Sequence, residues 1–204
     1  MNLYDRFILP RLVALAMRNR ALVPFRQRIG AAAAGRVLEL GIGTGLNLGF
    51  YGAGVTTVVG IDPSPALLRM AQGRVQGARV PVELLEATGE RLPVADHSVD
   101  TVVTTWTLCS VADPAQALRE ARRVLRPGGA LLFVEHGLAP DASVRWWQDR
   151  LTPAWQRIGG GCHLNRKPDA LIQAAGFRIE GLATGYVPGP RPLTFMFEGM
   201  ARPE

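Results

Sequence analysis

The feature that most constrains the fold is an apolar run ending in three glycines at alternate positions, Gly41, Gly43 and Gly45. The run has the length of a buried strand, and the residues after Gly45 are compatible with a helix. Glycine adopts backbone conformations that other residues avoid, and its missing Cβ lets a ligand lie against the backbone. The N-terminus of a following helix would favour an anionic group. The stretch therefore predicts the nucleotide-binding corner of an open α/β sheet.

The spacing of nearby residues bears on which nucleotide such a corner would bind. A dinucleotide fingerprint places its third glycine at position 46, where this chain has Leu46, and a pyrophosphate is then harder to accommodate. Asp62 ends the next apolar run, 21 residues after Gly41, at the spacing of a carboxylate that binds ribose hydroxyls. Enzymes of nicotinamide dinucleotides and of S-adenosylmethionine both use such an acid. Together with Glu39 inside the first strand, these residues make the corner a specific signal.

Strand-like and helix-like segments alternate through most of the chain, which is typical of a parallel sheet with right-handed crossovers. The predicted strands are 36–41, 55–61, 80–86, 98–105, 129–136, 177–183 and 193–202. The predicted helices are 3–18, 46–51, 64–76, 114–125, 142–155 and 167–175. Pro24 is expected to break the helical pattern, and Pro127-Gly128-Gly129 is expected to end a helix and turn the chain.

Residues 37–47 resemble motif I of the class I S-adenosylmethionine-dependent methyltransferases. Segments 87–100, 108–114 and 118–129 resemble later motifs of that family, in the same order, so the resemblance covers about residues 36–136. It matches the type 11 methyltransferase domain. It implies a Rossmann-like α/β fold with a mostly parallel seven-stranded sheet, an antiparallel last strand and helices on both faces.

The resemblance also implies the cofactor, S-adenosylmethionine, with S-adenosylhomocysteine as product, and the residues around it. The expected cofactor-binding residues are Glu39, Gly41, Gly43, Gly45, Asn47, Asp62, Pro63, Thr88, Gly89, Glu90, Thr105 and Trp106. Thr88 departs from the family, which usually has an acid in its adenine-binding turn. Trp106 is interpreted either as a flat surface for the adenine or acceptor, or as a core residue.

Residues 149–166, with 107–111 and 134–136, resemble the methyltransferase-like thiol S-methyltransferases, in which a membrane-associated enzyme methylates small alkyl thiols. The chain departs from them at its start, where a broken helix with arginines replaces a hydrophobic anchor. Quinone and phospholipid methyltransferases are similar in a more general way. The resemblance therefore implies a small lipophilic acceptor, with thiol S-methylation favoured and quinone or phospholipid methylation as the alternative.

Charge is concentrated at the start of the chain. Of the net charge of +6, residues 1–30 carry +5, from six arginines and one acid. We therefore expect a basic, amphipathic helical arm at residues 1–30, followed by the methyltransferase domain at residues 31–204. The arm is interpreted as a helix packed on the domain or as a peripheral membrane contact. The nearly neutral remainder argues against a nucleic-acid substrate, and the oligomeric state is open. With 204 residues and no spanning stretch or signal peptide visible, we expect a cytoplasmic protein.

Methyl transfer from a sulfonium needs an aligned acceptor and excluded water, and a base only if the acceptor arrives protonated. The candidate bases are Glu135 and His136, which end the fifth strand, and His163 in a glycine-rich loop. For both histidines a purely structural role is the alternative. Cys109 and Cys162 are interpreted as small buried apolar residues. Because the three histidines and two cysteines are scattered along the sequence, no metal site is predicted.

Two rival functions belong to other classes. A nicotinamide-dependent oxidoreductase would need the third fingerprint glycine and a second half that holds the nicotinamide. A protein that keeps the fold and binds S-adenosylmethionine without catalysis is the other rival. The sequence thus predicts a methyltransferase and leaves the acceptor atom open.

Overall fold

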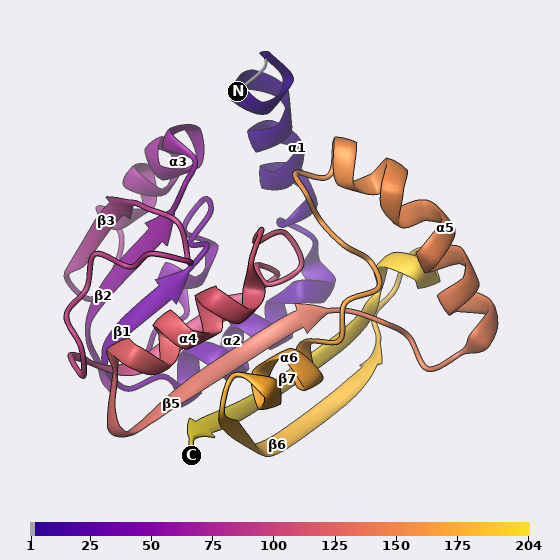
Figure 1. The fold of residues 1–204 in the computed structure, drawn as a ribbon. Helices are drawn as coiled ribbons and strands as arrows, with labels where there is room; N and C mark the ends of the chain where they lie inside the picture. The colour runs from indigo at the N-terminus through magenta and orange to yellow at the C-terminus, as the bar shows by residue number, and fades with distance from the viewer. Residues whose placement is uncertain (1–2) are drawn as a thin grey trace.

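A single seven-stranded sheet runs through the computed structural model, which describes residues 3–204 (Figure 1). The strands are β1 (Gly35–Leu40), β2 (Val55–Asp62), β3 (Val82–Glu86), β4 (Val99–Thr105), β5 (Leu125–His136), β6 (Phe177–Tyr186) and β7 (Phe195–Pro203). Their order in the sheet is β3-β2-β1-β4-β5-β7-β6. The first five strands pair in parallel, and β7 lies antiparallel between β5 and β6. This confirms the predicted Rossmann-like sheet with its antiparallel last strand.

Helices cover both faces of the sheet. The helices are α1 (Leu9–Ala16), α2 (Val23–Ala32), α3 (Pro65–Val75), α4 (Pro114–Val124), α5 (Ala142–Ile158) and α6 (Pro168–Ala174). In Figure 1, α4 and α6 lie in front of the sheet and α2 lies behind it. Successive strand residues face opposite sides, so Val37 packs with α2 while Leu38 packs with α4. Two hydrophobic cores, one on each face, hold the sheet between the helices.

The connections after β1 and around β5 differ from the sequence prediction. The expected helix 46–51 is only a four-residue 3-10 turn, Leu46–Gly49. The turn is too short to have a substantial helix dipole. An anion bound next to the glycines would therefore be held by individual backbone N–H groups. The expected strand 129–136 begins earlier, at Leu125. Val99 pairs with Leu125 and Thr101 pairs with Ala130, so two residues along β4 correspond to five along β5. The extra residues, which include Pro127-Gly128-Gly129, form a bulge in β5.

Helix α2 is the main element that the sequence analysis missed. Pro24 was expected to end the helical pattern, but it lies in the first turn of α2, where its missing N–H has no intrahelical partner to lose. The buried residues of α2 are Arg26, Ile29 and Gly30. The helix continues to Ala32, across the expected boundary between an arm at residues 1–30 and a domain that starts at residue 31. Its burial ties the N-terminal segment to the sheet.

The first helix starts with a π-helical turn, Tyr4–Ile8, and continues as α1. Its apolar face is exposed to solvent: Ile8 and Leu12 are 49% exposed and Leu15 is 71% exposed. The hydroxyl of Tyr4 donates a hydrogen bond of 2.6 Å to the carbonyl of Ile158 at the end of α5. Within residues 3–204, no helix combines the length and the apolar character needed to span a bilayer.

Candidate active site

All three glycines after β1 adopt the left-handed conformation, where the sequence required it of at least one. Their φ angles are +66° at Gly41, +56° at Gly43 and +73° at Gly45. A Cβ at Gly41 would lie 2.3 Å from the hydroxyl oxygen of Thr107, so this glycine is needed for packing. A Cβ at Gly43 would meet no atom closer than 3.8 Å. The backbone at Gly43 therefore borders open space, as a surface for a bound ligand requires.

Asp62, at the carboxyl end of β2, lies against this turn. One carboxylate oxygen accepts a hydrogen bond of 3.0 Å from the N–H of Gly43, and the other accepts one of 2.9 Å from the N–H of Ser64. Burial raises the pKa of Asp62, and these two hydrogen bonds oppose that effect. Each oxygen keeps a second lone pair for a hydroxyl donor. The exposed Pro63 follows directly.

A buried polar network lies beneath the turn. Asn47 donates to Glu39 at 2.7 Å and to Thr105 at 3.0 Å, and its carbonyl oxygen accepts from Arg26 at 2.5 Å. Tyr51 also donates to Glu39, at 2.7 Å. Burial raises the pKa of Glu39 to about 7. The network joins β1, β4 and α2, so Glu39, Asn47 and Thr105 support the turn from within the protein rather than lining open space.

Trp106 lies where β4 ends, with a φ of +53° that is unusual for a residue with a Cβ. The guanidinium of Arg26 lies 4.7 Å from the centre of its ring, and Phe25 meets it edge-on at 6.3 Å. Its indole N–H points to the sulfur of Met196 at 3.4 Å. The ring is thus packed against α2 and β7. This packing favours the interpretation of Trp106 as a core residue over that of a flat surface for the adenine or acceptor.

The loop after β3 holds Thr88, Gly89 and Glu90. Thr88 is exposed, and Gly89 and Glu90 are half-buried. The carboxylate of Glu90 accepts a hydrogen bond of 3.2 Å from the N–H of Asp113, the N-terminal cap of α4. The loop is therefore anchored on α4 and leaves the Thr88 side chain available.

Glu135 is fully buried and faces the segment after β4. Its carboxylate accepts hydrogen bonds from the Thr104 hydroxyl at 2.7 Å and from the N–H groups of Thr107 and Leu108 at 2.9 and 3.1 Å. Burial raises the pKa of Glu135 to about 6. These contacts give the carboxylate a clear structural task, which is to fix the segment that leads to Cys109.

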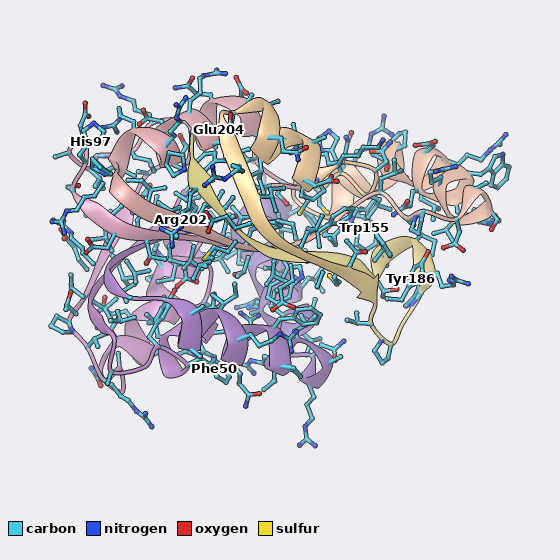
Figure 2. The ribbon with its side chains drawn as sticks, turned by 90° about the horizontal axis from the view of Figure 1, so that it is seen from below. Phe50, His97, Trp155, Tyr186, Arg202 and Glu204 are labelled. Carbon is cyan, nitrogen blue, oxygen red and sulfur yellow. The ribbon has the colours of Figure 1, made fainter. Side chains whose placement is uncertain are left out.

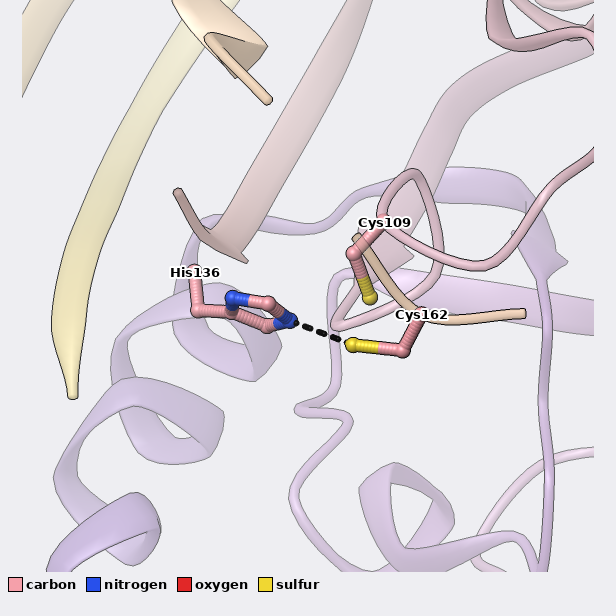
Figure 3. Close-up of side chains that lie close together, drawn as sticks. All are labelled: Cys109, His136 and Cys162. Carbon is pink, nitrogen blue, oxygen red and sulfur yellow. Dashed lines mark hydrogen bonds between the residues drawn. The ribbon is translucent and has the colours of Figure 1, made fainter. Parts of the chain in front are cut away.

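His136, the last residue of β5, belongs to a cluster that the sequence analysis did not foresee (Figure 3). Its Nε2 lies 3.1 Å from the Sγ of Cys162, and the Sγ of Cys109 lies within 4.8 Å of both atoms. The three side chains are 9%, 9% and 3% exposed, in the order His136, Cys162, Cys109. These three residues are scattered along the sequence, but the fold brings their side chains together.

His163 lies beside this cluster and is half-buried. Its backbone N–H donates to the carbonyl of Cys109 at 2.8 Å, and its Nδ1 lies 3.2 Å from the same oxygen. Arg166 also reaches across, donating to the carbonyls of Leu108 and Val111 at 2.5 and 2.8 Å. These contacts close the glycine-rich loop over the segment that follows β4.

An apolar groove of about 230 Å³ opens next to the cluster. Its lining residues are Leu151, Ala154, Trp155, Ile158, Leu164, Pro190, Pro192 and Leu193. Three of them, Trp155, Leu164 and Leu193, also pack around Cys109 and Cys162. Figure 2 shows Trp155 on the same side of the molecule as Tyr186, the last residue of β6. The groove can hold an apolar group a short distance from the two thiols.

Arg26, Tyr51 and Thr107 also belong to the site, although they are not among the site residues expected from the sequence. The sequence places Arg26 only in a basic arm, and its role in the site depends on α2, which the sequence pattern does not predict. Tyr51 follows the short 3-10 turn after the glycines, and no spacing rule marks it. A signal for Thr107 existed, since it follows the fourth strand at the edge where the ligand was expected.

Comparisons with known proteins place this geometry in a family. The model of the methyltransferase domain matches residues 38–133, which include the glycine turn, Asp62 and most of β5. A thiol S-methyltransferase of Rattus norvegicus, TMT1B, is 41% identical over 145 residues, which are 69% of this chain and 59% of that protein. The chain thus spans about three fifths of the length of such relatives.

Two further relatives act on other acceptors. A phosphatidylethanolamine N-methyltransferase of Cereibacter sphaeroides is 38% identical over 107 residues, 52% of each chain. The ubiquinone/menaquinone biosynthesis C-methyltransferase UbiE of Syntrophotalea carbinolica is 34% identical over 140 residues, 65% of this chain and 59% of that protein.

Solved structures agree on the fold. The crystal structure of an S-adenosylmethionine-dependent methyltransferase of Thermotoga maritima aligns with a TM-score of 0.69 and 22% identity, covering 98% of this chain and all of that chain. The cofactor of this family is S-adenosylmethionine, and the open backbone at Gly43 beside the carboxylate of Asp62 fits it. The chain belongs to the S-adenosylmethionine-dependent methyltransferases.

Proposed function

We propose that this chain transfers a methyl group from S-adenosylmethionine to the sulfur of a small lipophilic thiol. The observation that carries the cofactor side is the pairing of Asp62 with the N–H of Gly43, which holds a carboxylate beside open backbone at the carboxyl edge of the sheet. The similarity to thiol S-methyltransferases over 69% of the chain supports the thiol acceptor.

The residues take the following roles in this proposal. Gly41, Gly43 and Gly45 surround the methionine end of the cofactor, and Asp62 accepts hydrogen bonds from the ribose hydroxyls. Thr88, Gly89 and Glu90, with Pro63, border the adenine. Glu39, Asn47 and Thr105 support the glycine turn from the protein interior, because their side chains are hydrogen-bonded in one network with Arg26.

The cofactor, when bound, supplies a methyl group that is already activated by its sulfonium. The protein then has to hold the acceptor sulfur in line and exclude water. The apolar groove beside Trp155 and Leu164 suits the hydrocarbon part of the acceptor. Glu135 positions the segment after β4. His163, which is half-buried beside Cys109, is the side chain best placed to receive a proton from an acceptor thiol.

Calorimetric titration tests the cofactor assignment. Wild-type protein should bind S-adenosylmethionine and S-adenosylhomocysteine and not NAD. The Asp62→Ala variant should bind both at least tenfold more weakly, a change of about 1.4 kcal/mol. Asp96→Ala is the control, because the Asp96 carboxylate only pairs with Arg123 at the surface. Unchanged affinity in Asp62→Ala would remove Asp62 from the ribose site.

A panel of acceptors tests the thiol assignment. The probes are an alkyl thiol, the alcohol of the same chain length, a demethylated quinol and phosphatidylethanolamine vesicles. Methylation of the thiol and not the alcohol is expected. Methylation of the quinol or the phospholipid in preference to the thiol would contradict the assignment and favour the function of the two other relatives.

The exposed apolar face of α1 supports a peripheral membrane contact. Leu12 and Leu15 are exposed, and Arg11 and Arg18 are nearby in the sequence, so the helix has the composition of one that lies on an anionic lipid surface. Wild-type protein should sediment with vesicles that contain phosphatidylglycerol. Leu12→Glu with Leu15→Glu should abolish sedimentation, whereas Leu182→Glu, at an exposed leucine of β6, should not. Equal loss in both variants would argue against the contact.

A further inference from the structure

We propose that Cys109, His136 and Cys162 bind a zinc ion through two thiolates and one imidazole, with a fourth coordination position open to a ligand. The three side chains come from separate parts of the chain: the segment after β4, the end of β5 and the glycine-rich loop after α5. Their convergence in one buried place is the observation from which the inference starts (Figure 3).

The donor set and its dimensions suit zinc. Zinc prefers cysteine sulfur at about 2.3 Å and histidine nitrogen at about 2.0 Å in a tetrahedron. Those bond lengths place neighbouring ligand atoms roughly 3.5–3.8 Å apart. Here Nε2 of His136 and Sγ of Cys162 are 3.1 Å apart, and all three ligand atoms lie within 4.8 Å of one another. Small side-chain rotations would therefore complete the geometry.

The backbone around the ligands is held by several contacts. Glu135 binds the N–H groups of Thr107 and Leu108, and Arg166 binds the carbonyls of Leu108 and Val111. The N–H of Cys162 donates to the carbonyl of Gly159 at 3.3 Å. Such support is what keeps metal ligands in place before the metal arrives.

Three protein ligands leave one position of the tetrahedron free, as in zinc sites that take part in catalysis. The use of that position rests on the proposed function. An acceptor thiol would bind there as a thiolate: its S–H bond breaks, the proton goes to His163 beside Cys109, and a sulfur–zinc bond forms. The apolar groove, which shares Trp155, Leu164 and Leu193 with the packing around the cysteines, would hold its hydrocarbon part.

Metal analysis of the reduced, full-length protein tests the site. Wild-type protein, stripped with a chelator and reloaded, should bind one zinc ion per chain in competition with a chromophoric chelator. Cobalt in place of zinc should give an absorption band from thiolate-to-metal charge transfer. Cys109→Ala, Cys162→Ala and His136→Ala should each weaken zinc binding at least tenfold. His97→Ala, at a histidine that only contacts the carbonyl of Leu125, is the control.

The outcomes separate this inference from the proposed function. Wild-type protein that binds no zinc, or whose cysteines form a disulfide in the presence of zinc, would overturn the metal site. Thiol methylation that is equally fast in stripped and reloaded protein would overturn the use of the open position, while the proposed function stands. Zinc binding without any thiol methylation would leave the site intact and contradict the proposed function. Thermal unfolding of each variant shows whether it is folded.

Discussion

The phenolic hydroxyl of Tyr51 donates a hydrogen bond of 2.7 Å to the carboxylate of Glu39, and each side chain is only 1% exposed. Burial raises the pKa of Glu39 to about 7, although Tyr51 and Asn47 both stabilise its charged form. A carboxyl group under the cofactor turn therefore titrates near neutral pH instead of near its usual value.

This pKa predicts how stability depends on pH. Between about pH 4.5 and pH 7 the folded protein binds more protons at Glu39 than the unfolded chain does, so the free energy of unfolding falls as pH rises. The contribution is about 3 kcal/mol over that interval. Urea unfolding at several pH values should show this decline in wild type and a flatter profile in Glu39→Gln. Parallel profiles would show that Glu39 keeps an ordinary pKa.

Two glycines of the turn should respond differently to alanine. Gly41→Ala places a Cβ 2.3 Å from the Thr107 hydroxyl oxygen in a left-handed conformation, so it should cost about 3 kcal/mol in unfolding free energy. Gly43→Ala has the conformational strain without the clash and should cost about 1–2 kcal/mol. In the proposed site, the added Cβ would enter the space of the cofactor. Calorimetry should therefore show that Gly43→Ala loses more cofactor affinity than Gly41→Ala does for the same loss of unfolding free energy. Equal effects on both quantities would contradict this distinction.

Arg26 should matter far more than its neighbour Arg28. Arg26 is 6% exposed and bridges Asn47 and the carbonyl of Met17, so Arg26→Ala should lower the unfolding free energy by about 3 kcal/mol and weaken cofactor binding. Arg28→Ala breaks a surface ion pair with Glu198 and should cost less than about 1 kcal/mol. Denaturant unfolding of both variants checks this, and similar losses would show that the buried bridge is not special.

Glu135 should act as an anchor for the segment after β4. Glu135→Gln replaces an oxygen that accepts backbone hydrogen bonds with an amide donor, and should cost about 2–3 kcal/mol. Thr104→Val removes only one donor to the same carboxylate and should cost about 1 kcal/mol. Thermal unfolding compares the two. A Gln variant as stable as wild type would mean that the segment is held by other contacts.

The parts of the fold that depend on local chemistry could be predicted from the sequence. Gly41, Gly43 and Gly45 occupy left-handed conformations because only glycine does so at little cost, and the spacing to Asp62 placed it at the end of β2. Alternating strands and helices predicted the sheet. Helix α2 was not predicted because a proline has two opposite effects, depending on its position. Inside a helix it breaks the helix, whereas in the first turn it is favourable, and the identity of Pro24 alone does not tell which position it occupies.

The Cys109–His136–Cys162 cluster depends on contacts between distant parts of the chain, and these could not be predicted from the sequence. Cys109 and Cys162 are 53 residues apart, and their approach requires that the glycine-rich loop fold back over the end of β4. His163 and Arg166 fasten that loop through carbonyl groups, which carry no sequence signature. The roles of the individual side chains in cofactor binding and catalysis stay predictions.

The guanidinium of Arg26 contacts both the end of the first helix, at Met17, and the side chain beneath the glycine turn, at Asn47. Arg26 thus connects α1, which forms the proposed lipid contact, with the glycine turn, which forms the proposed cofactor site. Linkage makes the coupling between two such sites symmetric. If a lipid surface raises cofactor affinity by some factor through this bridge, the cofactor raises lipid affinity by the same factor. Enzyme with cofactor bound would then stay at a lipid surface, where acceptors of the proposed lipophilic kind would collect.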